Sequence, residues 1–304
     1  MQQIGTGKPE NTSLIKAREF WSPLPPAKYG SEEQKKECDL SLYAGEDRVI
    51  SSTEWLAEHD REPPYLFSLK SRIAGIDDAI EGFRDGELYT ISGFTKNGKT
   101  TLARTLTEAF VKQQVLPLWF TYEVPTKQFL GQWQNCPFFY LPRQHQGKSM
   151  RWFINRCEES FYKHGTKVIF IDHLHYLFDL SGNRSPSIDI GQIVRTLKLM
   201  ATRNSILIFL ICHTSKNNVG QTEPSYMDLR DSSFIAQESD SVLMIHRLPK
   251  ANPKDPKELD YAKVFIEFHR RTGVLRKTVT LQMLPNKLFG EMTEKYIEKQ
   301  GWET

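Results

Sequence analysis

The run Gly93-Phe94-Thr95-Lys96-Asn97-Gly98-Lys99-Thr100 has the residue types and spacing of a phosphate-binding loop. In such a loop, backbone N–H groups point at an anion beside a helix N-terminus. The lysine ammonium can reach the β- and γ-phosphates, and the final hydroxyl can reach Mg²⁺. A β-prone run precedes the loop and a helical pattern follows it, which favours this interpretation over a glycine turn without a ligand. We predict that ATP and Mg²⁺ bind here, through Gly93, Asn97, Gly98, Lys99, Thr100 and Thr101.

Three further polar residues each follow a predicted apolar strand, where ligands bind at the edge of a parallel sheet. Asp172 is suited to hold Mg²⁺, as a second metal-binding residue beside Thr100; the alternative is a turn cap. Glu123 can polarise an attacking water, or it is an exposed residue at a strand end. His213 can contact the γ-phosphate, or it makes a structural hydrogen bond.

From residue 69 onward, predicted strands alternate with predicted helices, and several strands are apolar throughout. A sheet covered by helices on both faces requires such strands. We therefore predict an α/β fold with a mainly parallel central sheet flanked by helices. The predicted strands are 87–92, 115–122, 167–172, 206–211, 241–245, 262–270 and 277–283; the predicted helices are 100–112, 150–163 and 188–204.

The first 66 residues differ from the rest, because prolines and a charged run replace the periodic apolar pattern. We interpret residues 1–66 as an N-terminal arm or linker, 67–290 as the α/β domain and 291–304 as a C-terminal tail. Within the arm, Ser51 followed by Glu54 has the spacing of a capping box and predicts a short helix.

Composition excludes several classes of protein. The chain of 304 residues has a net charge of +3, which by itself is weak support for nucleic-acid binding. Its four cysteines contain no C-x-x-C pair, which argues against a zinc site or a disulfide framework and fits a cytoplasmic location. Since no apolar run reaches about 18 residues, we expect no membrane span.

Together these features resemble the RecA-type motor core, and specifically the ATPase domain of the DnaB-type hexameric helicases. The resemblance covers about residues 69 to 285. Its most specific part is residues 227–243, which are similar to the family's D-L-R-E-S-G run and the I-x-Q-D-A-D segment after it. The other similar stretches are residues 71–88, 120–124, 171–174 and 194–201.

The resemblance implies a role for each catalytic candidate. Glu123 corresponds to the catalytic carboxylate and Asp172 to the Walker B acid. His213 stands where the bacterial branch has a glutamine that senses the γ-phosphate. Arg270 corresponds to an arginine finger that completes the ATP site of the next subunit. Phe268 stands where the family often has a lysine, however, so Arg271 is the alternative finger.

Contacts to single-stranded DNA are also implied. Arg230, Asp231 and Ser233 match a family loop that faces the DNA backbone, and two polar loops carry Arg184 and Lys216. Small charges add up along a nucleic acid when a ring presents each loop many times. A group of aromatic residues could stack bases, although core packing is the more common use. This group is Trp133, Phe138, Phe139, Tyr140 and Trp152.

The sequence thus predicts an ATP-hydrolysing motor that forms a homo-oligomeric ring, a hexamer, translocates on single-stranded DNA and unwinds duplex DNA. Replication proteins are expected as further partners. Alternatives are a recombinase-like filament, a KaiC-like signalling ATPase, and a nucleotide-gated DNA-binding protein without catalysis. The run at residues 228–232 favours the helicase branch, and the joint presence of Lys99, Glu123 and Asp172 argues against a non-catalytic protein.

Overall fold

The computed structural model describes residues 44–144, 149–174, 186–214, 223–229, 232–248 and 260–292, without the side chains of 186–189 and 232–233. The chain divides into two units between Glu62 and Pro63. In the first unit, helix α3 (Ser52–His59) begins where the Ser51 hydroxyl accepts the Glu54 N–H at 3.1 Å, which confirms the predicted helix start. The proposed limits of the arm, the domain and the tail stay predictions.

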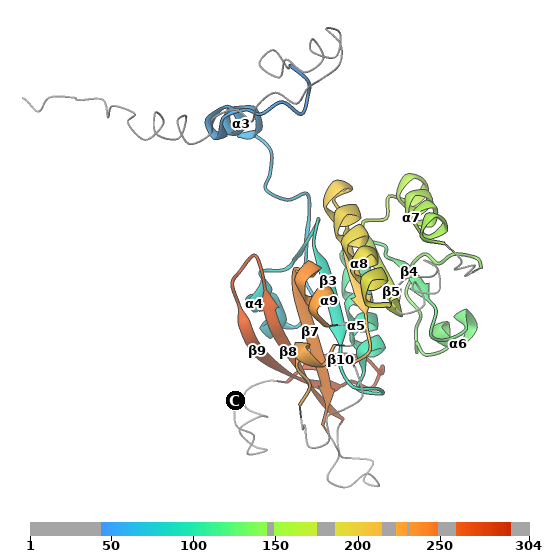
Figure 1. Ribbon diagram of the computed structural model, residues 1–304. Coiled ribbons are helices and arrows are strands. Elements are labelled where there is room, and N and C mark those ends of the chain that lie inside the picture. The colour runs from blue at the N-terminus through green and yellow to red at the C-terminus, as the bar shows by residue number, and fades with distance from the viewer. Residues whose placement is uncertain are drawn as a thin grey trace, which may run out of the picture. The chain divides into compact units, whose positions relative to one another are not determined.

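The second unit is built on a sheet that has eight strands within the described residues (Figure 1). Their order across the sheet is β10-β9-β8-β7-β3-β6-β5-β4. The five strands from β7 to β4 pair in parallel, while β8, β9 and β10 extend the sheet in antiparallel pairing, so the sheet is mainly parallel as predicted. The strands are β3 (Leu88–Ser92), β4 (Leu118–Thr121), β5 (Val168–Asp172), β6 (Leu207–Ile211), β7 (Ser241–Arg247), β8 (Tyr261–His269), β9 (Leu275–Met283) and β10 (Phe289–Glu291).

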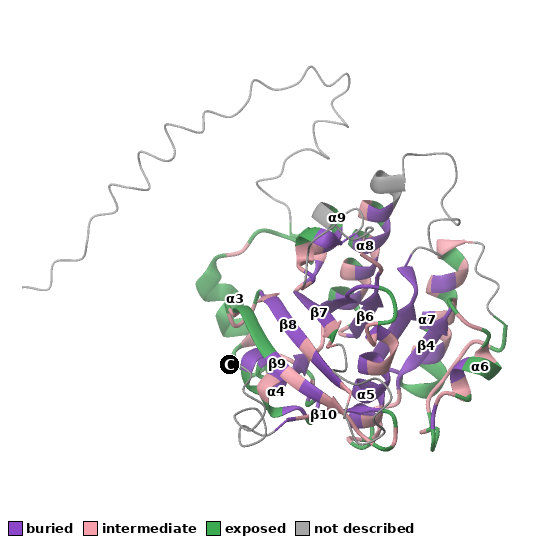
Figure 2. Cartoon of the chain, turned by 90° about the horizontal axis from the view of Figure 1, so that it is seen from below, coloured by how far each residue is buried: buried purple, intermediate pink, exposed green. Residues whose placement is uncertain are grey.

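Helices cover both faces of this sheet, and the parallel strands β3, β4, β5 and β6 are buried throughout (Figure 2). Along β6, Leu207, Phe209 and Ile211 belong to one core cluster, while Ile208 and Leu210 belong to the other. This alternation follows from the period of two in a strand and explains why the strand is apolar throughout. The first cluster includes apolar residues of α4 (Ala74–Ile80) and α5 (Lys99–Val111), and the second includes those of α7 (Met150–His164), α8 (Pro186–Arg203) and α9 (Ser232–Glu238).

The predicted elements match the structure within a few residues, with one clear difference. Strand β4 begins at Leu118, three residues later than predicted, because Pro117 has no N–H to donate to a neighbouring strand. Its carbonyl instead accepts the N–H of Tyr140 at 2.9 Å. Several short elements were not predicted from the sequence. They are β10, the helices α4, α6 (Thr126–Leu130) and α9, the two-stranded ribbon of β1 (Ser68–Leu69) and β2 (Phe83–Arg84), and the 3₁₀ helix η3 (Tyr226–Asp228). Among the described residues, no helix has the length and apolar character to cross a membrane.

A group of stacked aromatic rings lies within the core cluster on the α5 side. Phe170 stacks between Trp119 and Phe209, with ring centroids 4.6 Å away in both cases. Trp119 also donates its indole N–H to the Thr107 hydroxyl of α5 at 2.9 Å. Of the aromatic residues considered for base stacking, Trp133 and Phe139 pack in this cluster and Tyr140 and Trp152 pack against the other, whereas Phe138 is 64% exposed.

Removing the central ring should therefore destabilise the whole sheet. We expect Phe170→Ala to lower the free energy of unfolding by about 3–5 kcal/mol, because a cavity opens between two stacked rings. The matched control is Phe138→Ala, which should change it by no more than about 0.5 kcal/mol. Urea unfolding followed by tryptophan fluorescence measures both, and equal losses in the two variants would contradict this view of the core.

Candidate nucleotide site

The phosphate-binding loop connects β3 to α5 and packs tightly against the end of β7. Gly93 has φ +144°, and a Cβ atom there would lie 2.1 Å from the carbonyl oxygen of Ile245. Gly98, at φ +98°, is the N-cap of α5, so the helix begins at Lys99 as the motif requires. The Asn97 side-chain oxygen accepts the N–H of Arg247 at 2.7 Å, which ties the loop to β7 a second time. The loop is thus fixed at its two glycines and by one side chain.

Lys99 is buried and directed into its own loop. Its ammonium donates to the carbonyls of Gly93 at 3.0 Å and Phe94 at 3.1 Å. Burial lowers the pKa of Lys99, and the nearby carboxylates of Glu123 and Asp172 act in the opposite direction. An ammonium held on carbonyls inside an anion-binding loop can exchange these partners for phosphate oxygens.

Asp172 ends β5 and is linked directly to the loop. The Thr100 hydroxyl donates to Asp172 Oδ2 at 2.9 Å, although the two residues are far apart in sequence. Burial raises the pKa of Asp172 to about 7; the Thr100 hydrogen bond and the Lys99 charge lower it, while Glu123 raises it further. Its other oxygen, Oδ1, is buried and has no hydrogen-bond partner among the described residues. A hydroxyl beside a carboxylate with a spare oxygen is a donor set that fits Mg²⁺, which prefers oxygen ligands.

Glu123 and His213 lie at the same edge of the sheet. Glu123 follows β4, and its backbone N–H points to the Asp172 carbonyl at 3.4 Å. Its carboxylate is 4.0 Å from His213 Nε2. The His213 ring in turn contacts that of His173, with centroids 3.9 Å apart. The structure therefore brings together the loop, the two predicted carboxylates and the predicted histidine, because the parallel strands β3, β4, β5 and β6 all end at this edge.

Arg270, in contrast, lies at the opposite edge of the sheet. Strand β8 runs antiparallel to β7, so its last residue, His269, pairs with Ser241, the first residue of β7. Ser241 in turn pairs with Tyr89, four residues before Gly93. At about 3.3 Å per residue, at least roughly 13 Å of strand separates Arg270 from its own phosphate loop. Within one chain, Arg270 is therefore not part of the nucleotide site.

The predicted DNA-binding residues cannot be placed in the same way. Arg184, Lys216, Arg230 and Asp231 lie outside the described residues, and of Ser233 only the backbone, in α9, is described.

Thr101, the last of the predicted ATP-binding residues, lies in the first turn of α5, where its carbonyl accepts the Thr105 hydroxyl at 2.9 Å.

Sequence reasoning missed two residues that shape the loop. Phe289 packs its ring over Gly98, where a Cβ atom would be 3.0 Å from the ring, and its N–H donates to Thr105 Oγ1 at 3.0 Å. Arg247 supplies the N–H that Asn97 accepts. Both contacts join residues 150 or more positions apart, and no local pattern signals them.

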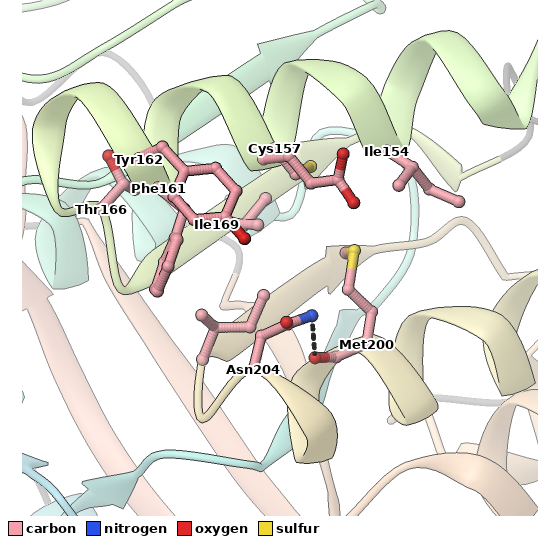
Figure 3. A pocket seen from close by; sticks show the side chains of 10 residues that line it. Ile154, Cys157, Phe161, Tyr162, Thr166, Ile169, Met200 and Asn204 are labelled. Atoms are coloured by element: carbon pink, nitrogen blue, oxygen red, sulfur yellow. Dashed lines mark hydrogen bonds between the residues drawn. The ribbon is translucent and has the colours of Figure 1, made fainter.

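A cavity between α7 and α8 is separate from this site (Figure 3). Ile154, Phe161 and Met200 contribute apolar surface to its lining, and Glu158, Thr166 and Asn204 contribute polar groups. The Asn204 amide donates to the Met200 carbonyl at 3.1 Å. Thr166 and Ile206, which precede β5 and β6, place it toward the sheet edge remote from Asp172. None of the predicted site residues lines it.

A mainly parallel sheet with a phosphate loop after a central strand and an acid at the end of a nearby one is the arrangement of a P-loop fold. The family model of the "DnaB-like helicase C terminal domain" matches residues 134–288, and the chain belongs to this family. The matched range contains Asp172, His213 and Arg270, whereas the phosphate loop precedes it.

Curated relatives are distant and longer than the match. A "Probable replicative DNA helicase" of Trieres chinensis is 23% identical over 244 residues, which is 68% of this chain and 54% of the relative. A "Probable plasmid replicative DNA helicase" of Chlamydia psittaci is 25% identical over 151 residues, or 49% of this chain and 31% of the relative. The chain thus spans about half or less of the length of these relatives.

Solved structures show the same fold. One that is described as an ATPase domain superposes with a TM-score of 0.68 at 17% identity, covering 81% of this chain and 100% of that domain. A DnaB-like replicative helicase, studied with its primase interactions, superposes with a TM-score of 0.67 at 16% identity, covering 93% of this chain and 74% of that one.

The close approach of the loop to β7 can be tested with two glycines. We expect Gly93→Ala to lower the urea midpoint of unfolding strongly, because the new methyl group collides with the Ile245 carbonyl. Gly165→Ala is the matched control, since Gly165 also has positive φ, +65°, but has no atom within 4 Å of a new Cβ. The control should lose about 1–2 kcal/mol for its backbone conformation alone. A Gly93 variant as stable as the control would show that the loop is not held against β7.

Proposed function

We propose that this chain is an ATP-hydrolysing, DnaB-like motor that translocates on single-stranded DNA and unwinds duplex DNA. The observation that carries the proposal is the Thr100–Asp172 hydrogen bond, which joins the phosphate loop to the carboxylate at the end of β5. Membership of the DnaB-like helicase family supports the same function.

In this proposal the loop residues Gly93, Asn97, Gly98, Lys99, Thr100 and Thr101 bind the phosphates of ATP. Lys99 leaves the carbonyls of Gly93 and Phe94 for the β- and γ-phosphate oxygens. Thr100 and Asp172 would hold Mg²⁺, with the spare oxygen of Asp172 available to it. When bound, Mg²⁺ neutralises charge on the β- and γ-phosphates.

Glu123 is the proposed catalytic carboxylate. It is partly exposed, as a group that must orient a water molecule needs to be, and its backbone is held beside Asp172. His213 is the proposed γ-phosphate sensor. It comes after β6, the strand next to β5, and its ring lies 4.0 Å from the Glu123 carboxylate. A histidine beside the catalytic carboxylate can report whether the γ-phosphate is present through a change of hydrogen-bond partner.

Arg184, Lys216, Arg230, Asp231 and Ser233 are proposed to contact the backbone of single-stranded DNA. The first two follow β5 and β6, the strands that end in Asp172 and precede His213, and Ser233 lies in the first turn of α9. Lys216 is three residues after His213, so a DNA contact there would be close along the chain to the nucleotide site. Replication proteins are proposed as further partners of the motor.

The assignment of Lys99 and Glu123 separates nucleotide binding from chemistry. Lys99→Ala should weaken ATP binding and abolish turnover. Glu123→Gln should bind ATP nearly normally but hydrolyse it at least about 100-fold more slowly, because the amide cannot take a proton from water. Binding of a fluorescent ATP analogue and phosphate release, with and without single-stranded DNA, measure both effects.

Glu108→Gln is the control for this comparison, since Glu108 lies on α5 and forms an ion pair with Lys112. It should retain normal turnover. Normal turnover in Glu123→Gln would remove the catalytic role of Glu123. ATP binding without any turnover in the unaltered chain, with or without DNA, would favour the nucleotide-gated, non-catalytic protein instead.

We further propose that each ATP site is completed by Arg270 of a neighbouring copy in a hexameric ring. Arg270 is exposed and lies at the sheet edge away from its own loop, so within one chain it has no path to its own phosphates. The guanidinium of Arg271 is engaged by its own chain, which favours Arg270 as the finger. A guanidinium suits this role because it stays charged and forks onto phosphate oxygens.

A mixing experiment tests the shared site. Arg270→Ala should lower ATP turnover about 1,000-fold or more, as loss of an arginine finger does. Mixed with Lys99→Ala protein, it should regain part of the activity, because some interfaces then combine an intact loop with an intact finger. Full activity of Arg270→Ala alone would refute the shared site, as would turnover by a protein that stays monomeric with ATP and DNA present.

A further inference from the structure

The turn after β8, which carries Arg270, is clamped by the side chain of the next residue, Arg271. The Arg271 guanidinium crosses from this turn to the segment that joins α4 to β2. It makes three contacts at the end of α4 and just after it, where Nη1 donates to Glu81 Oε2 at 3.2 Å and Nη2 donates to the carbonyls of Ile80 at 2.7 Å and Gly82 at 2.8 Å. A fourth contact reaches the residue before β3, where Nε donates to Glu87 Oε1 at 2.8 Å. Four acceptors arranged around one planar group match the fork of arginine and not the point charge of lysine.

Behind this clamp lies a buried polar network. Glu87 Oε2 accepts the Tyr89 hydroxyl at 2.9 Å, and the same hydroxyl contacts His269 Nε2 at 3.0 Å. His269 Nδ1 contacts the Thr272 hydroxyl at 2.8 Å, and that hydroxyl also lies 3.0 Å from the Ala79 carbonyl. Burial lowers the pKa of His269 and, together with Glu87, raises that of Tyr89, so both are neutral near pH 7. Arg271 is thus the cation that balances the buried Glu87 carboxylate.

The backbone on the other side of Arg270 is anchored as well. Its N–H donates to the Asp240 carbonyl at 2.9 Å, and the Asp240 carboxylate accepts the Leu88 N–H at 2.7 Å and the Lys198 ammonium at 2.6 Å. The Arg270 guanidinium, by contrast, contacts one group among the described residues, the carbonyl of Gln237 near the end of α9. The backbone of Arg270 is therefore fixed while its side chain is exposed and lightly held.

We propose that Arg271 is a positioning residue that sets the direction of the finger Arg270 toward the neighbouring copy's ATP. This inference rests on the proposed shared site. Arg271 does not itself serve as the finger, because its withdrawal would leave the nearly buried Glu87 carboxylate without its counterion, and uncompensated buried charges are costly. The clamp acts on geometry: it ties residues 269–273 to residues 79–87, so that only the Arg270 side chain moves when phosphate replaces the Gln237 carbonyl.

A positioning role and a merely structural role differ in a trans-rescue experiment on the full chain. We expect Arg271→Ala to bind the fluorescent ATP analogue within about threefold of normal, since the loop lies at the other edge of the sheet, while kcat falls at least about tenfold. Mixed with Lys99→Ala protein, it should recover activity as Arg270→Ala does, because the partner supplies an intact finger. The double variant Arg270→Ala, Arg271→Ala should be no slower than Arg270→Ala alone, since the two residues act through one contact.

Two further variants keep the test decisive. Arg271→Lys preserves the charge but not the fork and should restore part of kcat, which also covers the case that Arg271→Ala does not fold. Arg276→Ala is the control, because Arg276 lies on β9 and pairs with Glu267 and Glu223 away from the clamp; its kcat should stay normal.

The possible failures can be told apart. If Arg270→Ala recovers on mixing and Arg271→Ala does not, or if Arg271→Ala has normal kcat or loses ATP binding, the positioning role is wrong and the shared site stands. If Arg270→Ala itself is fully active or never recovers, the shared site is wrong, and the role of Arg271 is refuted with it.

Discussion

Parallel pairing of β3 with both β6 and β7 is the constraint on which the rest of the structure depends. It places the ends of these strands at one edge of the sheet, so side chains that follow separate strands meet without any local signal between them. The phosphate loop fits at this edge only because Gly93 leaves room for the Ile245 carbonyl of β7. Core packing on both faces of the sheet then serves to hold that edge in register.

The site at this edge carries charge that burial makes costly. Burial raises the pKa of Asp172 and lowers that of Lys99, and each group partly offsets the effect on the other. Thr100 satisfies one oxygen of Asp172, while the other oxygen has no hydrogen-bond partner in the described part of the chain. A buried acceptor without a partner is expensive, and a cation with oxygen preference would relieve that cost. Under the proposed function, a Mg²⁺ ion bound together with the nucleotide would offset this cost.

Residue patterns predicted most strands of the sheet, its three longest helices and the edge where the site lies. Apolar runs predicted β3, β5 and β6 to within a residue or so, and acids or a histidine after such runs were expected to meet because parallel strands end together. Contacts that involve the antiparallel part of the sheet could not be predicted from the sequence. Phe289 over Gly98, and Arg271 on Glu87, depend on how β8, β9 and β10 extend the sheet, which no spacing in the chain encodes. The choice between Arg270 and Arg271 needed the hydrogen bonds of Arg271 and could not be made from residue types alone.

Strand β3 connects the two edges in a way that bears on assembly. One of its ends continues into the phosphate loop, and at the other end Leu88 bonds to Asp240 and Tyr89 to His269, next to Arg270. A buried strand of five residues is a rigid spacer, so the offset between a chain's own loop and its own finger is fixed. Under the proposed shared site, the edge of one copy that carries Arg270 faces the phosphate-loop edge of the next copy. Two different surfaces then meet, so the interface is heterologous, or head-to-tail. Such an interface gives a ring when its rotation closes and a filament when it does not. The alternative between a hexameric ring and a recombinase-like filament therefore depends on the rotation and the rise between neighbouring copies, which are set where the finger of one copy enters the loop of the next.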